Sequence, residues 1–289
     1  MGVPQMIAVY LFETSVGPVL FETGLHSCLP FLEKGLAKIG YKTEDIKHVF
    51  LTHIHLDHAG AAWYFAQQGA TVYVHEKGYK HLIDPSKLID SAKKIYRDRM
   101  DPLWGKFKPI PKSQLVIASH QEIFTLGDQE IKALNTPGHA YHHIAWKTSD
   151  GLICGDVAGI RIESGPPVPP CPPPDVRLDL WRTSIDTLLK EEQETLFLAH
   201  YGVFQDGIAH LKYLKEEIDI VEKFTYELFQ SEPNPKKAVP QFDEWSKARM
   251  QDTCPSKSIA DYYGMANPTY MNLQGMYRYY KKREANELV

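Results

Sequence analysis

Four side chains able to bind metal lie within six residues, at His53, His55, Asp57 and His58, in the pattern H-x-H-x-D-H. Imidazole nitrogen and carboxylate oxygen suit borderline divalent cations such as zinc, iron and manganese. On an extended segment, alternate residues converge on one side while the next pair turns to a second position. The cluster therefore indicates a metal site with room for two adjacent ions. The alternative, a solvated polar turn, seldom has three histidines at this spacing.

The elements around this cluster should be a short strand before it, at residues 48–52, and a helix after it, at residues 59–68. A hairpin is expected from the runs 7–12 and 18–23, and further strands at 71–75, 196–199 and, as five short runs, between 115 and 156. Helical periodicity marks 29–39, 77–100 with a break at Asp84-Pro85, 179–190 and 208–230. Interleaved strands and helices favour a layered α/β protein.

Three more donors follow later in the chain, each in a short motif at the end of an expected strand. The motifs are Thr136-Pro137-Gly138-His139, Gly155-Asp156 and Ala199-His200-Tyr201-Gly202. Each alone is ordinary turn or loop chemistry. In this order and together with the first cluster, they resemble the metallo-β-lactamase-fold hydrolase superfamily over about residues 7 to 201.

The resemblance implies an αββα sandwich with additional C-terminal helices, and a site at one edge between the two sheets. It implies two divalent metal ions, with zinc expected first and iron or manganese as alternatives. The implied ligands are His53, His55 and His139 for one ion, Asp57, His58 and His200 for the other, and Asp156 as the bridge.

A pair of divalent ions lowers the pKa of a shared water from ~15.7 toward ~7 and so supplies hydroxide at neutral pH. We therefore expect a dinuclear-metal hydrolase in which a metal-bridging hydroxide cleaves a small ester, thioester or lactone. By resemblance, Asp57 would also be catalytic, passing a proton to the leaving group. A phosphodiesterase on the same site and an iron-dependent persulfide dioxygenase are the alternatives. A binding protein without turnover would have little use for a complete ligand set.

Three residues near the motifs are candidates for supporting or substrate-binding roles. Glu22 stands in Glu22-Thr23-Gly24, where the family has Asp-Thr-Gly, and could orient a ligand imidazole. His143 matches a histidine often seen after the TPGH segment, and either supports a ligand or packs in a strand. Tyr201 could bind a substrate oxygen or simply pack. Five histidines have no motif partner and are expected on the surface or satisfied internally: His75, His81, His120, His142 and His210.

The chain after Tyr201 is largely helical in pattern. We expect a metallo-β-lactamase-fold catalytic domain over residues 1–206 and a C-terminal helical extension over residues 207–289 packed on it, similar in layout to glyoxalase II-like thioesterases. The aromatic and methionine content of the extension indicates that it covers something: the domain's own helical layer, the pocket, or a second subunit in a homodimer. The proline-rich segment 165–174 is either a rigid pocket wall or a connector.

Composition sets the remaining expectations. The chain has 289 residues, 43% of them hydrophobic, and a net charge of -4, which is ordinary for a globular protein. No apolar run approaches the ~18 residues of a membrane span, and the start does not resemble a signal peptide. We expect a cytoplasmic protein with a small-molecule substrate, no membrane association and no nucleic-acid partner, since no basic stripe is present. Four dispersed cysteines are expected to be reduced thiols.

Overall fold

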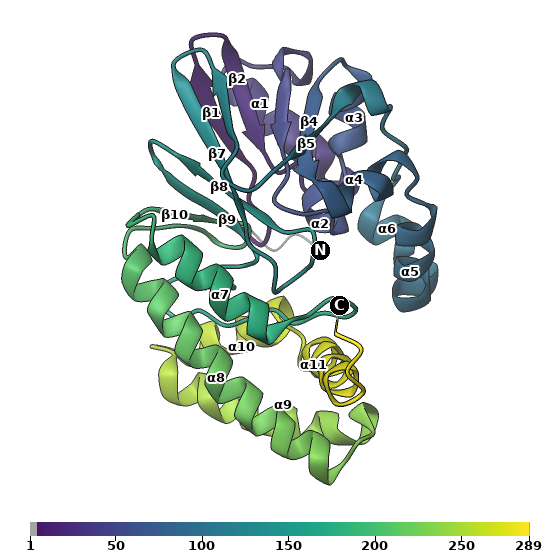
Figure 1. The fold of residues 1–289 in the computed structure, drawn as a ribbon, viewed down its shortest axis with the longest axis vertical. Coiled ribbons are helices and arrows are strands. Elements are labelled where there is room, and N and C mark those ends of the chain that lie inside the picture. The colour runs from purple at the N-terminus through teal and green to yellow at the C-terminus, as the bar shows by residue number, and fades with distance from the viewer. Residues whose placement is uncertain (1–4, 289) are drawn as a thin grey trace. The chain divides into compact units, whose positions relative to one another are not determined.

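The computed structural model describes residues 5 to 288, which form two compact units. The first, here called the sheet unit, comprises residues 7–135 and 142–155. The second, here called the helical unit, comprises the described parts of residues 1–6, 136–141 and 156–289. Figure 1 shows both units and labels many of their elements. The expected division at residue 206 into a catalytic domain and an extension remains a prediction.

The sheet unit contains strands of two sheets. The first sheet has the order β1-β2-β3-β4-β5, in which β1 and β2 are an antiparallel hairpin and the later pairs are parallel. Its strands are β1 (Tyr10–Thr14), β2 (Gly17–Phe21), β3 (His48–Phe50), β4 (Thr71–His75) and β5 (Leu115–Ala118). The second contributes an antiparallel meander: β6 (Ile123–Leu126), β7 (Gln129–Asn135), β8 (Ile144–Thr148) and β9 (Gly151–Gly155). All nine correspond to predicted strands.

Aromatic side chains join the facing surfaces of these two sheets. Phe50 of β3 stacks on Tyr73 of β4, with ring centroids 4.1 Å apart, and meets Trp146 of β8 edge-on at 5.0 Å. Phe124 of β6 lies 4.9 Å from Tyr73. Such edge-to-face pairs add stability beyond the area they bury. This aromatic packing therefore holds the ends of the strands, and the loops that follow them, in fixed positions.

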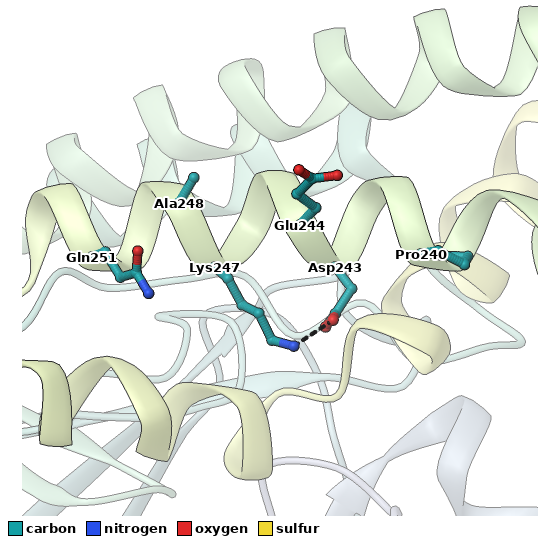
Figure 2. A pocket seen from close by; sticks show the side chains of 6 residues that line it. All are labelled: Pro240, Asp243, Glu244, Lys247, Ala248 and Gln251. Carbon is teal, nitrogen blue, oxygen red and sulfur yellow. Dashed lines mark hydrogen bonds and ion pairs between the residues drawn. The ribbon is translucent and has the colours of Figure 1, made fainter.

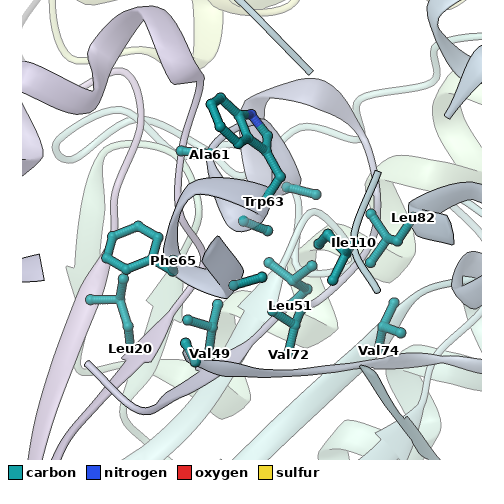
Figure 3. Packing of buried hydrophobic residues seen from close by; sticks show 14 of the residues in the cluster. Leu20, Val49, Leu51, Ala61, Trp63, Phe65, Val72, Val74, Leu82 and Ile110 are labelled. Atoms are coloured by element: carbon teal, nitrogen blue, oxygen red, sulfur yellow. The ribbon is translucent and has the colours of Figure 1, made fainter. Parts of the chain in front are cut away.

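Helices cover the other face of the first sheet. Phe65 and Trp63 pack there with Leu20, Val49 and Val72 of the strands, in a fully apolar cluster (Figure 3). The helices of the sheet unit are α1 (Leu29–Lys38), α2 (Leu56–Ala59), α3 (Ala62–Gln67), α4 (Glu76–Ile83), α5 (Ser86–Tyr96) and α6 (Met100–Trp104). Short 3-10 helices occur at His26–Cys28, Thr43–Asp45, Arg97–Arg99 and Lys112–Gln114.

The single helix expected at residues 59–68 is two short helices, α2 and α3. The break has a local cause, because the N–H of Ala61 donates to the carbonyl of Gly24 at 3.1 Å instead of continuing the first helix. Gly60 permits this approach, since a Cβ at that position would come within 3.0 Å of the same carbonyl oxygen. The consequence is that α2 is only one turn long and carries Asp57 and His58 at its start.

The helical unit holds one strand pair and five helices among its described residues. They are β10 (Leu196–Leu198), β11 (Gly202–Phe204), α7 (Leu178–Leu189), α8 (Gly207–Ser231), α9 (Pro235–Thr253), α10 (Lys257–Ala266) and α11 (Thr269–Glu284). Helix α8 packs on α7, and α11 packs on α8 and α9 (Figure 1). Tyr277 and Tyr280 of α11 are buried against Phe229 of α8, so much of the aromatic content forms this unit's own core.

A shallow depression on α9 is lined mostly by polar side chains, at Pro240, Asp243, Glu244, Lys247, Ala248 and Gln251 (Figure 2). Asp243 and Lys247, one turn apart, form an ion pair at 2.6 Å there (Figure 2). An exposed pair of this kind stabilises a helix by about 0.3–0.5 kcal/mol, which fits a solvated surface. No helix within residues 5–288 combines the length and apolarity that crossing a membrane would demand.

Candidate metal centre

In the sheet unit, His53 and His55 follow β3 on an extended segment and their rings converge. Nε2 of His53 lies 2.9 Å from Nδ1 of His55, with the two rings nearly perpendicular. The other nitrogen of His53, Nδ1, is 3.1 Å from the hydroxyl of Thr52. Because both facing atoms are ring nitrogens, they can bind one cation together. The expected convergence of alternate residues is observed for this pair.

Asp57 and His58 belong to the first turn of α2, where the chain changes from extended to helical. Oδ2 of Asp57 lies 3.8 Å from Nε2 of His58. The His58 side chain is only 2% exposed, whereas that of Asp57 is 26% exposed. The sheet unit therefore presents a second pair of donors, of which the carboxylate is open to solvent.

Glu22 lies at the end of β2, beside His58. Its Oε1 accepts the backbone N–H of Thr52 at 3.1 Å, and its Oε2 lies 3.5 Å from Nδ1 of His58. Glu22 has a positive φ of 65°, which is unusual for a residue with a side chain. A carboxylate on the far nitrogen of an imidazole orients the ring, so the position fits the role expected for Glu22.

Two further histidines lie against the first donor pair. The ring of His143 stacks on that of His53 at 5.1 Å, and the ring of His142 lies 5.5 Å from that of His55. His142 also receives the N–H of Ile54 at 3.5 Å, so it is internally satisfied, as expected of a histidine outside the motifs. Its place beside His55 carries no signal in the sequence, because no motif links residues 55 and 142.

In the helical unit, Asp156 stands between two imidazoles. Its Oδ2 lies 3.2 Å from Nε2 of His139, and its Oδ1 lies 3.2 Å from Nε2 of His200. Two ligands of a tetrahedral zinc ion, each bound at about 2.0–2.1 Å, lie about 3.3 Å apart. The two oxygens of one carboxylate thus face different histidines at a separation that suits shared metal ligands.

The far nitrogens of these two imidazoles are held by backbone carbonyls. Nδ1 of His139 is 2.9 Å from the carbonyl of Pro170, and Nδ1 of His200 is 2.6 Å from that of Met6. A carbonyl can only accept, so each Nδ1 carries the proton and, in the neutral ring, each Nε2 presents a lone pair toward Asp156. A cation bound between the two lone pairs would remove the repulsion between them. Imidazoles whose other nitrogen donates to a backbone carbonyl are usual in metal sites.

The carbonyl of Pro170 gives the proline-rich segment a structural role. Residues 165–171 are buried, and this segment is anchored by the N–H of Cys171 on the side chain of Asn272 and by the hydroxyl of Tyr263 on the carbonyl of Pro166. The segment therefore orients the imidazole of His139. The sequence indicates an ordered proline segment, but nothing in it identifies which carbonyl meets the histidine.

Tyr201, adjacent to His200, has a positive φ of 68°, and its N–H donates to the carbonyl of Gln5 at 2.8 Å. Its ring packs against an apolar cluster that includes Ile162 and Tyr263. Its hydroxyl is buried and has no hydrogen-bond partner among the described residues, and burial raises the pKa of this phenol. A substrate contact by Tyr201 remains a prediction.

These histidines and carboxylates include groups of donors that could hold a metal ion. The chain matches the family model described as the metallo-beta-lactamase superfamily over residues 2–200, and it therefore belongs to that superfamily. Two sheets and additional C-terminal helices match structures of this fold. Most members of the superfamily are metal-dependent hydrolases.

One protein is similar to this chain in sequence and in fold, and a second is similar in fold. The metallo-beta-lactamase fold-containing protein ST1585 of Sulfurisphaera tokodaii is 26% identical over 228 residues, which are 75% of this chain and 82% of that protein. Its solved structure gives a TM-score of 0.64 over 94% of this chain and 93% of that one, at 22% identity. The metallo-beta-lactamase family protein TTHA1429 of Thermus thermophilus gives a TM-score of 0.69 at 19% identity, over 99% of this chain and 92% of that one.

Proposed function

We propose that this protein is a dinuclear-metal hydrolase that cleaves a small ester, thioester or lactone. The observation that carries the proposal is the carboxylate of Asp156, whose two oxygens face the ring nitrogens of His139 and His200. One ion, with zinc expected before iron or manganese, would be held by His53, His55 and His139. The other would be held by Asp57, His58 and His200, with Asp156 shared between them.

The two ions, when bound, supply hydroxide at neutral pH and polarise the carbonyl under attack. The chain's own residues would orient the ligands and transfer the proton. The carbonyls of Pro170 and Met6 fix two imidazoles, and Glu22 supports the third at Nδ1 of His58. Asp57, at 26% exposure, has the solvent access needed to receive a proton and pass it to the leaving group.

His143 and Tyr201 complete the proposed site in supporting roles. The ring of His143 lies against His53, where it limits the tilt of that imidazole. The hydroxyl of Tyr201, which is buried and has no hydrogen-bond partner within residues 5–288, would donate to a substrate oxygen if the substrate reaches it. We further propose that the enzyme acts in the cytoplasm and that a second copy docks on its C-terminal helices, some of whose side chains, such as Tyr262 and Met265, are exposed.

Metal analysis of natively purified protein, followed by a substrate panel, tests the proposal. We expect two divalent ions per chain and turnover of aryl esters, thioesters or lactones. Hydrolysis of bis-aryl phosphates in their place would identify a phosphodiesterase. If the protein contains one iron per chain and consumes oxygen when a persulfide is added, it is a persulfide dioxygenase and not a hydrolase.

The variant Asp57→Asn tests the proposed proton transfer. It should slow turnover most for substrates with poor leaving groups, because these groups need the proton in order to depart.

A further inference from the structure

Trp181 of α7 connects the two loops of the helical unit that carry His139 and Asp156. Its indole N–H donates to the carbonyl of Val157, directly after Asp156, at 2.7 Å. Its ring meets that of His139 edge-on, with centroids 5.8 Å apart and an interplanar angle of 82°. Trp181 is fully buried. The side chain of Trp181 therefore contacts both Val157, which follows Asp156, and the imidazole of His139.

The loop before His139 lies directly on the backbone of α7. Gly138 has a φ of 151°, and a Cβ at this position would come within 2.5 Å of Cα and Cβ of Trp181. The carbonyl of Gly138 accepts the N–H of Arg177 at 2.8 Å. Only a glycine allows this approach, so the position of the His139 loop is set by α7 itself.

Two side chains of α7 that hold these loops share one face of the helix, because Trp181 and Ser184 are three residues apart, which is the spacing of neighbours on a helix surface. Arg177, whose backbone N–H bonds the carbonyl of Gly138, is the residue directly before α7. Ser184 donates its hydroxyl to the carbonyl of Pro137 at 2.6 Å. Three hydrogen bonds, to the carbonyls of residues 137, 138 and 157, thus fasten both loops to α7 and to the residue before it.

We propose that Trp181 is a positioning residue of the metal centre, which holds His139 and Asp156 at the separation that a shared cation requires. The inference rests on the proposed function. Nε2 of His139 and Oδ2 of Asp156 lie 3.2 Å apart. Removal of the indole N–H leaves the buried carbonyl of Val157 without this donor, and the loop must shift to find another. Asp156 then moves relative to His139.

If Trp181 only packed in the core, its replacement would have a different effect. A residue that only fills volume lowers the free energy of unfolding when it is replaced, while the metal affinity of the folded protein is unchanged. A residue that positions ligands lowers metal affinity as well. Partners one step removed from a metal typically change affinity by about 10- to 100-fold when they are replaced.

The test measures zinc affinity by chelator competition, and the absorption spectrum of the cobalt-substituted protein, for Trp181→Phe and a matched control. The control is Trp63→Phe, which also removes a buried indole N–H, here bonded to the carbonyl of Lys106 at 3.0 Å, in a loop that carries no proposed ligand. We expect Trp181→Phe to bind zinc about 10- to 100-fold more weakly and to change the cobalt spectrum, and Trp63→Phe to do neither.

Equal zinc affinity in Trp181→Phe and the unaltered protein would overturn the inference and leave the proposed function intact. An unaltered protein that binds no metal would overturn both. Should Trp181→Phe fail to fold, Ser184→Ala removes the bond to the carbonyl of Pro137 with little change in volume. It should weaken zinc binding several-fold, whereas Thr187→Ala, on the same helix, should not, because the hydroxyl of Thr187 donates to the carbonyl of Thr183 within α7.

Discussion

Oδ1 of Asp156 lies 3.2 Å from Nε2 of His200. The second oxygen of this carboxylate, Oδ2, lies at the same distance from Nε2 of His139. One aspartate therefore contacts two histidines that are separated by about sixty residues of sequence. Both imidazoles are fixed from behind by backbone carbonyls. This geometry supports the proposal that Asp156 is the ligand shared by two metal ions.

Replacing this carboxylate should remove the function. We expect Asp156→Ala to lower the metal content of the purified protein and to reduce kcat/KM by about 10³-fold or more, since metal catalysis contributes several kcal/mol of transition-state stabilisation. Elemental analysis and steady-state kinetics measure the two effects. Asp252→Ala, an exposed aspartate of α9, serves as the control. An active Asp156→Ala protein with full metal content would contradict the assignment of the bridge.

Glu22 should act through His58. Glu22→Gln keeps an oxygen that can accept the N–H of Thr52 but removes the charge 3.5 Å from Nδ1 of His58. We expect metal affinity to fall about 10- to 100-fold, measured by chelator competition, with a small change in the free energy of unfolding. Glu13→Gln, at an exposed glutamate, should leave the affinity unchanged. Unaltered affinity in Glu22→Gln would assign this residue to loop structure alone.

Gly138→Ala should destabilise the fold more than a strained turn explains. Gly40 also has a positive φ, of 87°, but has open space around it, so Gly40→Ala should cost about 1 kcal/mol from backbone conformation. At Gly138, the collision with Trp181 adds about 1–3 kcal/mol. Urea unfolding of both variants gives the difference. Equal losses in the two variants would show that the loop can move away from α7 at no cost.

His210 should make the protein sensitive to acid. Burial lowers its pKa from 6.5 to about 4, with Nε2 bonded to the carbonyl of Ala158 at 2.7 Å and Arg161 close to Nδ1. Above pH 6.5, His210 is neutral in both folded and unfolded chains and costs nothing. As the pH falls from 6.5 to 4, only the unfolded chain gains this proton, so stability decreases by about 1.4 kcal/mol per pH unit.

The variant His210→Gln isolates this contribution, because glutamine can donate to the same carbonyl and does not titrate. Between pH 7.5 and pH 4.5, we expect it to lose about 2–3 kcal/mol less stability than the unaltered protein in denaturant unfolding. His120→Gln, at an exposed histidine, should follow the unaltered protein. Parallel pH profiles for His210→Gln and the unaltered protein would show that this imidazole is not protonated selectively in the unfolded chain.

Much of the fold could be predicted from the sequence, because its strands and helices have strong local signals. The strand at 71–75 and the helix ending at Gly40 agree with β4 and α1 to within a residue. The break between α2 and α3 could not be predicted, since it depends on the carbonyl of Gly24, far away in sequence. The strand β11 is not predicted either, because it begins at Gly202, inside the motif that the sequence analysis places at the end of a strand.

The donors of the candidate site were predictable because metal ligands must have particular chemical types at particular points of the chain. The groups that hold these donors in place could not be predicted in the same way. The carbonyls of Pro170 and Met6 are backbone atoms, which every residue has, and Trp181 reaches its loops from a helix that carries no motif. Such contacts arise from tertiary packing, and a single sequence contains no pattern for them.

Metal removal and restoration test the central claim most directly. The protein is dialysed exhaustively against a strong chelator, its metal content is measured, and its esterase, thioesterase and lactonase activities are compared before dialysis, after dialysis and after titration with zinc. We predict that activity disappears with the metal and returns as the content approaches two ions per chain. Full activity in a protein shown to be metal-free would contradict the account.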